Sequence, residues 1–363
     1  MLKHFDYHLL ISVVVLLILG IVVLASVSGI YSQENFGKTT YYFFHQLIFG
    51  LIPGIIGGFV AFRMPLTFFK KWSWLFVLIN LFLMVLVFIP GIGIVSGGAP
   101  RWLNLRFVSF QPSEFLKISF IIYLSAWLMN RVKEKKHSSS LVPFLFIIGF
   151  IVLLLTCQSD ASTMGIIFLI GGLMYFSANT PFWHNILIFG MGMGIVMLLI
   201  KFAPYRLERI LVFLKPDTDP MGLGYQLKQA LITIGSGGIF GLGLGASQQR
   251  FGFLPQTMSD SIFAIFSEET GFVGAFILIL IFLIFLWRGL RIAKSVDDNF
   301  SQFFAIGFTC WICFQSFINI GSMLGLLPLT GIPLPFISYG GSHLIAELTG
   351  VGILLNISKS IKK

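Results

Sequence analysis

Long, uninterrupted apolar stretches are the feature of this sequence that most restricts its fold. Hydrophobic residues make up 56% of the 363 positions, and charged residues only 10%. In lipid, only helices and closed barrels satisfy their backbone hydrogen bonds, and barrel strands show short alternating segments rather than long apolar runs. We therefore predict an all-α, polytopic membrane protein of about ten transmembrane helices, near residues 9–29, 44–62, 72–90, 112–130, 141–157, 160–178, 183–202, 262–287, 302–327 and 338–357.

A large loop at about residues 203–260 separates the seventh predicted helix from the eighth. No linker or internal repeat divides the rest, so residues 1–363 are predicted to form a single membrane domain. The first helix follows Lys3 and could pass for a signal peptide. Its roughly 20 apolar residues exceed a usual signal core, and we interpret it as an uncleaved anchor.

The distribution of basic residues predicts the orientation in the membrane. More than half of the 24 Lys and Arg residues fall in short loops on one side, which are therefore expected to be cytoplasmic. Both termini are then cytoplasmic, and the loop at 203–260 is extracytoplasmic. Such positions explain the net charge of +10 without any need for nucleic acid. The residues are Lys3, Arg63, Lys70, Lys71, Arg131, Lys133, Lys135, Lys136, Arg288, Arg291, Lys294, Lys359, Lys362 and Lys363.

Polar residues gather at the outer start of the fourth predicted helix. Pro112 and Ser113 are typical of a helix start, and Glu114 and Lys117, three apart, share one helix face where they can pair. The pair has two interpretations. It is a structural ion pair, or Lys117 and Arg101 offer cationic donors to an anionic substrate group while Glu114 orients the lysine.

The large loop holds further charged candidates. Arg206 and Arg209 lie on one face of an amphipathic segment at 205–213, which either anchors in the headgroup layer or binds a lipid-linked phosphate. The glycine-rich run 235–247 forms either an anion-binding nest or a loop that packs closely on a helix. Asp260 is either the N-cap of the eighth helix or a general base with a raised pKa.

Four acids, one histidine and one loop complete the set of candidates. Of Glu268 and Glu269, inside the eighth helix, at least one is expected to pair or to serve a polar cavity. Asp160 is predicted to cap a helix. The charge-free segment 330–342 is predicted to be a rigid wall or a re-entrant element near the same site, and His343 and Glu347 could pair after it.

Several of these stretches, in order along the chain, resemble the SEDS family of shape, elongation, division and sporulation proteins, and more its division branch than its elongation branch. The stretches are Gly98-Ala-Pro-Arg-Trp102, Gln111-Pro-Ser-Glu-Phe-Leu-Lys117, Tyr205-Arg206 with Arg209, the glycine-rich run, Leu254-Pro255 with Asp260, Glu268-Glu269 before Gly271, and Pro333-Leu-Pro-Phe-Ile-Ser-Tyr-Gly-Gly-Ser342. The resemblance covers nearly the whole chain.

The resemblance implies a peptidoglycan glycosyltransferase that polymerises lipid II at the outer face of the bacterial cytoplasmic membrane, in division or cell-shape wall synthesis. It implies a class B penicillin-binding protein as partner, alongside other divisome or elongasome membrane proteins. Asp260 matches the essential acid, and the substrate-binding groups are Lys117, Glu114, Arg101, Arg206, Arg209 and Ser342. The diphosphate leaving group needs cationic stabilisation, which a divalent cation such as Mg or Mn near Asp260 could supply. The competing hypotheses are a flippase for a lipid-linked precursor and a non-catalytic scaffold.

The chain departs from the family pattern at three places. Pro100 stands where the family usually has a cation, and Ser261 stands where a phenylalanine usually follows the acid. The run Gln158-Ser-Asp-Ala-Ser162 replaces Gln-Pro-Asp-Leu-Gly. These changes bear on substrate affinity more than on the fold.

Overall fold

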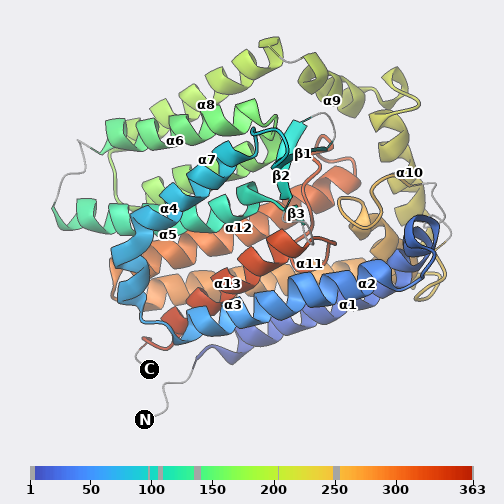
Figure 1. Cartoon of the computed structure of the whole chain (residues 1–363), viewed down its shortest axis with the longest axis horizontal. Helices are drawn as coiled ribbons and strands as arrows, with labels where there is room; N and C mark the ends of the chain where they lie inside the picture. Colours follow the sequence, from blue (N-terminus) through green and yellow to red (C-terminus); the bar gives the residue numbers. More distant parts are fainter. Residues whose placement is uncertain are drawn as a thin grey trace.

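The computed structural model of the protein describes residues 5–96, 99–104, 109–134, 140–202, 204–247 and 254–361. The described chain is almost entirely helical, which confirms the predicted all-α class (Figure 1). The elements are α1 Tyr7–Phe36, α2 Tyr41–Gln46, the π-helix η1 Leu47–Leu51, α3 Ile52–Arg63, α4 Leu66–Leu86, α5 Pro112–Lys133, α6 Leu141–Cys157, α7 Ala161–Ser177, α8 Phe182–Phe202, α9 Pro204–Leu214, the 3-10 helix η2 Pro216–Thr218, α10 Leu223–Ser236, α11 Ile262–Ser295, α12 Asn299–Met323 and α13 Gly341–Ser358.

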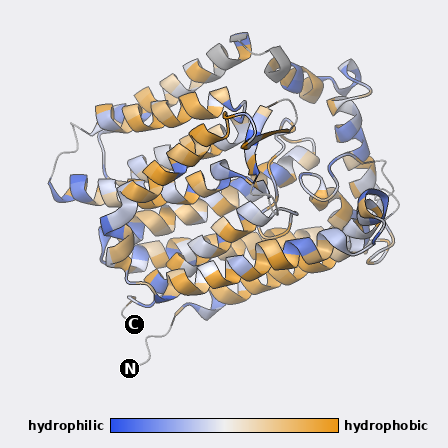
Figure 2. Cartoon of the chain, in the orientation of Figure 1, coloured by the Kyte–Doolittle hydropathy of each residue, from blue (hydrophilic) through white to orange (hydrophobic). Residues whose placement is uncertain are grey.

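The long helices are apolar enough for a multi-pass membrane protein. Within the described ranges, six helical stretches have the length and hydropathy to cross a membrane, and three shorter apolar helices accompany them. Apolar residues dominate these helices along their length (Figure 2). Each predicted span overlaps a helix, and α2, η1 and α3 together form the second. The number of crossings itself stays a prediction.

The centre of the bundle is buried, and its exterior is apolar. The most apolar window of α12 is 72% buried, whereas that of α11 is 22% buried. Large apolar side chains such as Phe146 and Phe189 are 76% and 69% exposed. Such a surface would be costly in water but suits contact with lipid.

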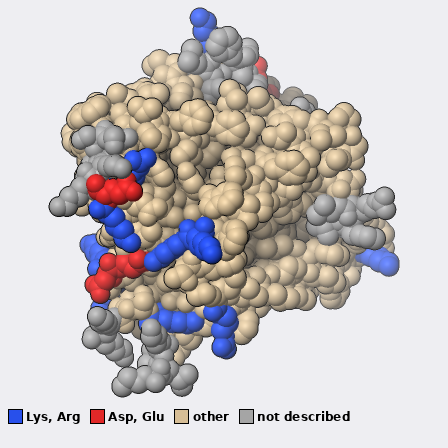
Figure 3. Space-filling view, turned by 60° about the vertical axis from the view of Figure 1, so that its left-hand side comes forward, with Lys and Arg blue, Asp and Glu red and all other residues tan. Residues whose placement is uncertain are grey.

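Both ends of the described chain lie at the same end of the bundle (Figure 1). The backbone N–H of Asp6 donates to Ser358 Oγ at 3.0 Å, and the Asp6 carboxylate forms an ion pair with Arg288 of α11. Lys70 of α4 and Asp298 form another ion pair at 2.8 Å. In Figure 3, most charged side chains of the face shown gather at its left and lower left. A few more lie at the top and at the right edge, and the broad surface between them is uncharged. This arrangement agrees with the predicted common location of the termini and basic loops. The predicted cytoplasmic residues Lys3, Lys135, Lys136, Lys362 and Lys363 lie outside the described residues.

The opposite end carries irregular structure that covers the bundle. A small antiparallel sheet, which the sequence did not predict, has the order β1 Gly93–Ser96, β2 Ala99–Asn104 and β3 Ser109–Phe110. Leu103 of β2 pairs with Gly93 on one side and with Phe110 on the other. The amphipathic segment predicted at 205–213 is confirmed as helix α9, and α10 follows it in the same long loop.

The glycine-rich run folds back onto α11. Gly271, with φ 67° and ψ −169°, interrupts α11 and lets its backbone accept the loop. The N–H groups of Leu242 and Gly243 donate to the carbonyls of Glu268 and Glu269, both at 3.0 Å. A Cβ at Gly241, whose φ is +81°, would lie 2.1 Å from the Glu269 carbonyl oxygen. Backbone groups committed in this way cannot wrap an anion, so the structure supports the close-packing alternative.

The two acids beside this contact are engaged with the loop, as expected for at least one of them. The Glu268 carboxylate accepts a hydrogen bond from the Ser247 hydroxyl. Glu269 Oε1 accepts from the backbone N–H of Gly245 at 3.1 Å and from the Ser26 hydroxyl of α1. These contacts fasten the glycine-rich run to both α1 and α11.

Candidate active site

A cavity of about 450 Å³ lies at the end of the bundle opposite the termini, among the loops and the starts of several helices. Helices α5, α7, α11 and α13 all begin beside it, so their N-terminal backbone dipoles point toward it. The lining residues are Arg101, Trp102, Gln111, Glu114, Lys117, Ser159–Thr163, Ile166, Arg209, Leu223, Gln226, Gln256, Ser259, Asp260, Met323, Leu329–Pro333, Tyr339, Gly340 and His343.

The cavity brings together most of the predicted site residues. Arg101, Glu114, Lys117, Arg209 and Asp260 all contribute to its lining, although they come from distant parts of the chain. Ser342 supports the cavity from behind, because its Oγ accepts the backbone N–H of Gln111 at 3.0 Å. The side chain of Arg206 lies outside the described part of the structure.

Asp260 precedes α11 and does not cap it. The N-cap of α11 is Ser261, which makes no side-chain capping bond, so the capping interpretation of Asp260 is wrong. The Asp260 backbone is held instead by Asn319 of α12, whose Nδ2 donates to the carbonyls of Asp260 and Ile332 at 2.8 and 2.7 Å. The carboxylate faces the cavity, where a Cβ at Gly331 would lie 3.3 Å from Asp260 Oδ2.

The segment 330–342 forms a wall of the cavity, as the sequence predicted. It is fastened to the loop before α11 that carries Asp260, residues 254–261, here called the acid loop. Ser338 Oγ donates to the Ser259 carbonyl at 2.6 Å, and the Tyr339 N–H donates to the Met258 carbonyl at 2.8 Å. Glu347 accepts the N–H of Phe336 at 2.8 Å. Glu347, on α13, therefore holds this wall in place. The His343 ring is hydrogen-bonded to Ser338 and not to Glu347, so these two residues do not form the pair that their spacing allowed.

The surroundings of Asp260 give its carboxyl group the pKa of a usable base. Burial raises the pKa of Asp260 to about 6, while the positive charge of Arg209 and a hydrogen bond from Ser259 oppose this increase. Arg209 reaches the site from α9, and its Nη1 donates to the carbonyls of Leu329 and Thr330 at 3.2 and 3.4 Å. A base with a pKa just below the working pH is ionised there and still accepts a proton.

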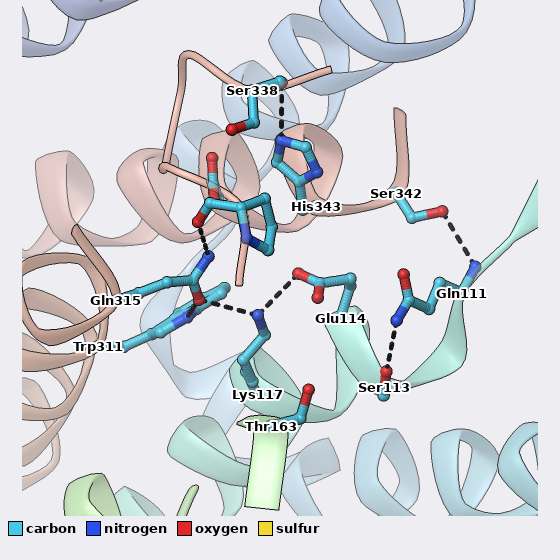
Figure 4. Close-up of polar contacts among 12 residues, drawn as sticks. Gln111, Ser113, Glu114, Lys117, Thr163, Trp311, Gln315, Ser338, Ser342 and His343 are labelled. Atoms are coloured by element: carbon cyan, nitrogen blue, oxygen red, sulfur yellow. Dashed lines mark hydrogen bonds and ion pairs between the residues drawn. The ribbon is translucent and has the colours of Figure 1, made fainter. Parts of the chain in front are cut away.

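Lys117 and Glu114 form the ion pair that the spacing predicted. Lys117 Nζ lies 2.7 Å from Glu114 Oε2, and both side chains are almost fully buried (Figure 4). The ammonium also donates to Gln315 Oε1 at 2.9 Å and lies 5.1 Å from the centre of the Trp311 ring. The ion pair itself is therefore confirmed, as both of its interpretations require. Both residues also line the cavity, so the pair contributes to its electrostatics, and a role in substrate binding stays a prediction.

Arg101 and Asp160 shape another part of the cavity wall. Arg101 of β2 donates from Nε to the Gln158 carbonyl at 3.1 Å and from Nη2 to the Ser159 carbonyl at 2.6 Å. Asp160 is the N-cap of α7, as predicted, and accepts the Thr163 N–H at 3.1 Å. The guanidinium of Arg101 thus fixes the turn that presents Asp160 to the cavity.

Ser261, which the sequence analysis singled out, and Gln315, which it did not, both have structural roles beside the cavity. Ser261 is fully buried, and its hydroxyl accepts from Gln226 Nε2 of α10 at 3.2 Å and donates to the Pro255 carbonyl at 2.9 Å. It therefore links α10 to the acid loop. Gln315 was not predicted, although an amide in the middle of an apolar helix was a usable signal. It joins Lys117 to the Pro333 carbonyl, to which its Nε2 donates at 3.0 Å.

The cavity offers few metal ligands from the protein alone. Among the described residues, no group of three or more His, Cys, Asp and Glu side chains could hold a metal ion. Mg²⁺ is commonly held by one or two carboxylates together with substrate phosphates, so Asp260 fits such an ion only if a substrate supplies the other ligands.

Comparisons with known proteins match the chain over nearly its whole length. The family model for FtsW/RodA/SpoVE proteins, described as "Cell cycle protein", matches residues 7–363. Stage V sporulation protein E of Bacillus subtilis is 39% identical over 98% of this chain and 97% of its own length. The probable peptidoglycan glycosyltransferase FtsW of Trichlorobacter lovleyi is 37% identical over 99% of this chain and 95% of its own length.

Solved structures show the same fold. A chain from a peptidoglycan synthase complex, studied for the coordination of polymerization and crosslinking, superposes with a TM-score of 0.78 at 26% identity, covering 98% of this chain and 97% of that one. The rod shape determining protein RodA of Thermus thermophilus superposes with a TM-score of 0.70 at 24% identity, covering 99% of this chain and 98% of that one.

Proposed function

The chain belongs to the FtsW/RodA/SpoVE family of cell cycle proteins, and we propose that it is a peptidoglycan glycosyltransferase that polymerises lipid II. The observation that carries this proposal is Asp260, a carboxylate with a pKa raised to about 6, facing a polar cavity. Curated relatives that the chain matches over nearly its whole length bear the name of this activity.

The cavity supplies what glycosyl transfer requires. Asp260 removes the proton from the 4-hydroxyl of the acceptor sugar, and the oxygen attacks the anomeric carbon of the donor sugar. The bond between that carbon and the diphosphate oxygen breaks, and the diphosphate leaves with the electron pair. Arg209 and the helix starts around the cavity favour an anion at this place. Lys117 contributes less net charge, because Glu114 neutralises it.

A divalent cation remains part of the proposal. Mg²⁺ or Mn²⁺ would be held by Asp160 together with the diphosphate, in the cavity that Asp260 also lines, and it would neutralise charge on the leaving group. Asp160 has a place for it, because its Oδ2 is buried without a hydrogen-bond partner.

The proposal places the cavity at the outer face of the bacterial cytoplasmic membrane, with both termini in the cytoplasm. The support is that both termini lie at the other end of the bundle (Figure 1), where the basic residues Lys70 and Arg288 form their ion pairs. A class B penicillin-binding protein is the proposed partner, because a structurally similar chain belongs to a peptidoglycan synthase complex. Other divisome or elongasome proteins would join them. Relatives from sporulation and division match almost equally well, so assignment to the division branch stays a prediction.

The test is to incubate the purified protein, with its partner, with labelled lipid II and to separate the products by size. We expect glycan chains, together with release of undecaprenyl diphosphate. A flippase would instead move lipid II across liposomes without lengthening it, and a scaffold would do neither. The cavity argues against transport because its polar groups come from helix starts at one end of the bundle, not from the middle of the membrane.

A further inference from the structure

His343 is a polar cavity residue that the proposed reaction does not use. It lies in the first turn of α13, with 4% of its surface exposed, and it lines the same cavity as Glu114 and Lys117. A polar ring at such a place must satisfy both of its nitrogens or leave one for a ligand. The two nitrogens have different surroundings.

One nitrogen of the ring is fixed by the wall of the cavity. His343 Nε2 lies 3.1 Å from the backbone carbonyl oxygen of Ser338 (Figure 4). A carbonyl oxygen can only accept, so Nε2 carries the hydrogen. In the neutral ring, Nδ1 is then an acceptor with a free lone pair. None of the described residues forms a hydrogen bond with Nδ1.

The space beside Nδ1 is kept open by a glycine. A Cβ at Gly340, whose φ is +155°, would lie 2.5 Å from Nδ1 and 2.6 Å from Cε1 of His343. Any side chain at this position would therefore cover the nitrogen. The backbone of Gly340 is itself anchored, because its N–H donates to Gln46 Oε1 at 3.0 Å.

A second acceptor lies nearby. Gln111 lines the cavity and uses its amide nitrogen to donate to Ser113 Oγ at 3.1 Å, which leaves its amide oxygen as an acceptor. Figure 4 shows Gln111, Glu114 and His343 grouped around the same region. Since Lys117 is already engaged by Glu114 and Gln315, this part of the cavity is rich in acceptors and suits a ligand that donates hydrogen bonds.

From this geometry we infer that His343 binds the sugar of the substrate through Nδ1, which accepts a hydrogen bond from the N–H of a 2-acetamido group or from a hydroxyl. The inference rests on the proposed function, since it takes the substrate to be an amino-sugar lipid. His343 is a binding residue here and does not transfer the proton.

Two isosteric substitutions separate this role from a structural one. The Asn side chain places its amide near the position of Nδ1, whereas the Gln side chain places its amide near Nε2 and can keep the bond to Ser338. We expect His343→Gln to raise the KM for lipid II by roughly fivefold to tenfold, the effect of one lost hydrogen bond, with kcat changed less. His343→Asn should stay within about twofold of the wild-type KM. Thermal unfolding of both variants shows whether they fold.

Any other pattern overturns the inference. Loss in the Asn variant with a wild-type KM in the Gln variant would assign the role to the Ser338 bond. Wild-type behaviour in both, or equal loss in both, would also contradict an acceptor at Nδ1. A lipid II analogue with an ester in place of the acetamido N–H identifies the donor. If the N–H is the donor, the analogue weakens wild type but not the Gln variant, whereas a hydroxyl donor leaves the difference between them intact. An inactive wild-type protein would instead refute the proposed function.

Discussion

The pH dependence of polymerisation should follow the protonation of Asp260. The proton acceptor must be ionised, and burial raises the pKa of Asp260 to about 6. At this pKa, about nine-tenths of the carboxyl groups are ionised at pH 7 and roughly one-tenth at pH 5, so kcat/KM should fall about tenfold between these values. Polymerisation of labelled lipid II in buffers of constant ionic strength measures this acidic limb.

Substitution of Arg209 tests whether this acidic limb of the pH profile reports the pKa of Asp260. Its positive charge lowers the pKa of Asp260, so Arg209→Gln should move the acidic limb to higher pH. Lys228→Gln is the matched control. It removes one positive charge from the neighbouring helix α10, where Lys228 forms an exposed ion pair with Asp217. That variant should leave the limb in place. The reasoning is refuted if the limb is unchanged in the Arg209 variant, or if it moves equally in both.

Three further outcomes are expected. Lys117→Met should destabilise the fold by about 3–5 kcal/mol, because it leaves Glu114 buried without its partner. Adding Glu114→Gln to this variant should restore stability. If the double variant also recovers full activity, the pair is only structural. Gly241→Ala should lower the unfolding temperature, because its Cβ would lie 2.1 Å from the Glu269 carbonyl oxygen, whereas Gly235→Ala has nothing within 4 Å and should not; equal effects would contradict the packing of the loop. Single cysteines can be placed in a chain whose Cys157, Cys310 and Cys313 have been replaced. A cysteine at Met221, which is 90% exposed, should react with a membrane-impermeant thiol reagent on intact cells, and a cysteine at Ser295 only after the membrane is opened. The reverse pattern would invert the proposed topology.

Hydropathy and local capping rules predicted the helical framework well. Apolar runs of membrane-spanning length leave the backbone little choice but a helix, and each predicted span overlaps one. Local chemistry also located Pro112 at the start of α5 and Asp160 at the N-cap of α7. The spacing of Glu114 and Lys117 was sufficient to predict their ion pair, because residues three apart on a helix are neighbours.

Long-range contacts could not be predicted from one sequence. The local pattern allowed Asp260 to cap α11, but Asn319 holds the Asp260 carbonyl and Ser338 of the segment 330–342 holds the neighbouring Ser259 carbonyl, so Asp260 stays outside the helix. The sequence of the glycine-rich run allowed an anion-binding nest. In the structure its N–H groups donate instead to the carbonyls of Glu268 and Glu269, beside the kink of α11 at Gly271. Ser342 was predicted to touch substrate, yet it holds the backbone of Gln111. In each case the deciding partner is far away in the sequence.

Polymerisation by an Asp260→Asn variant tests the central claim most directly. The amide keeps the size of the side chain but is not a base, and Asp260 does not cap α11, so the variant should unfold at the wild-type temperature. Loss of a general base typically costs a factor of about 10² to 10⁴ in rate. We therefore expect the folded, purified variant to form almost no glycan chains from lipid II. Polymerisation at a large fraction of the wild-type rate would contradict the assignment of Asp260 as the base.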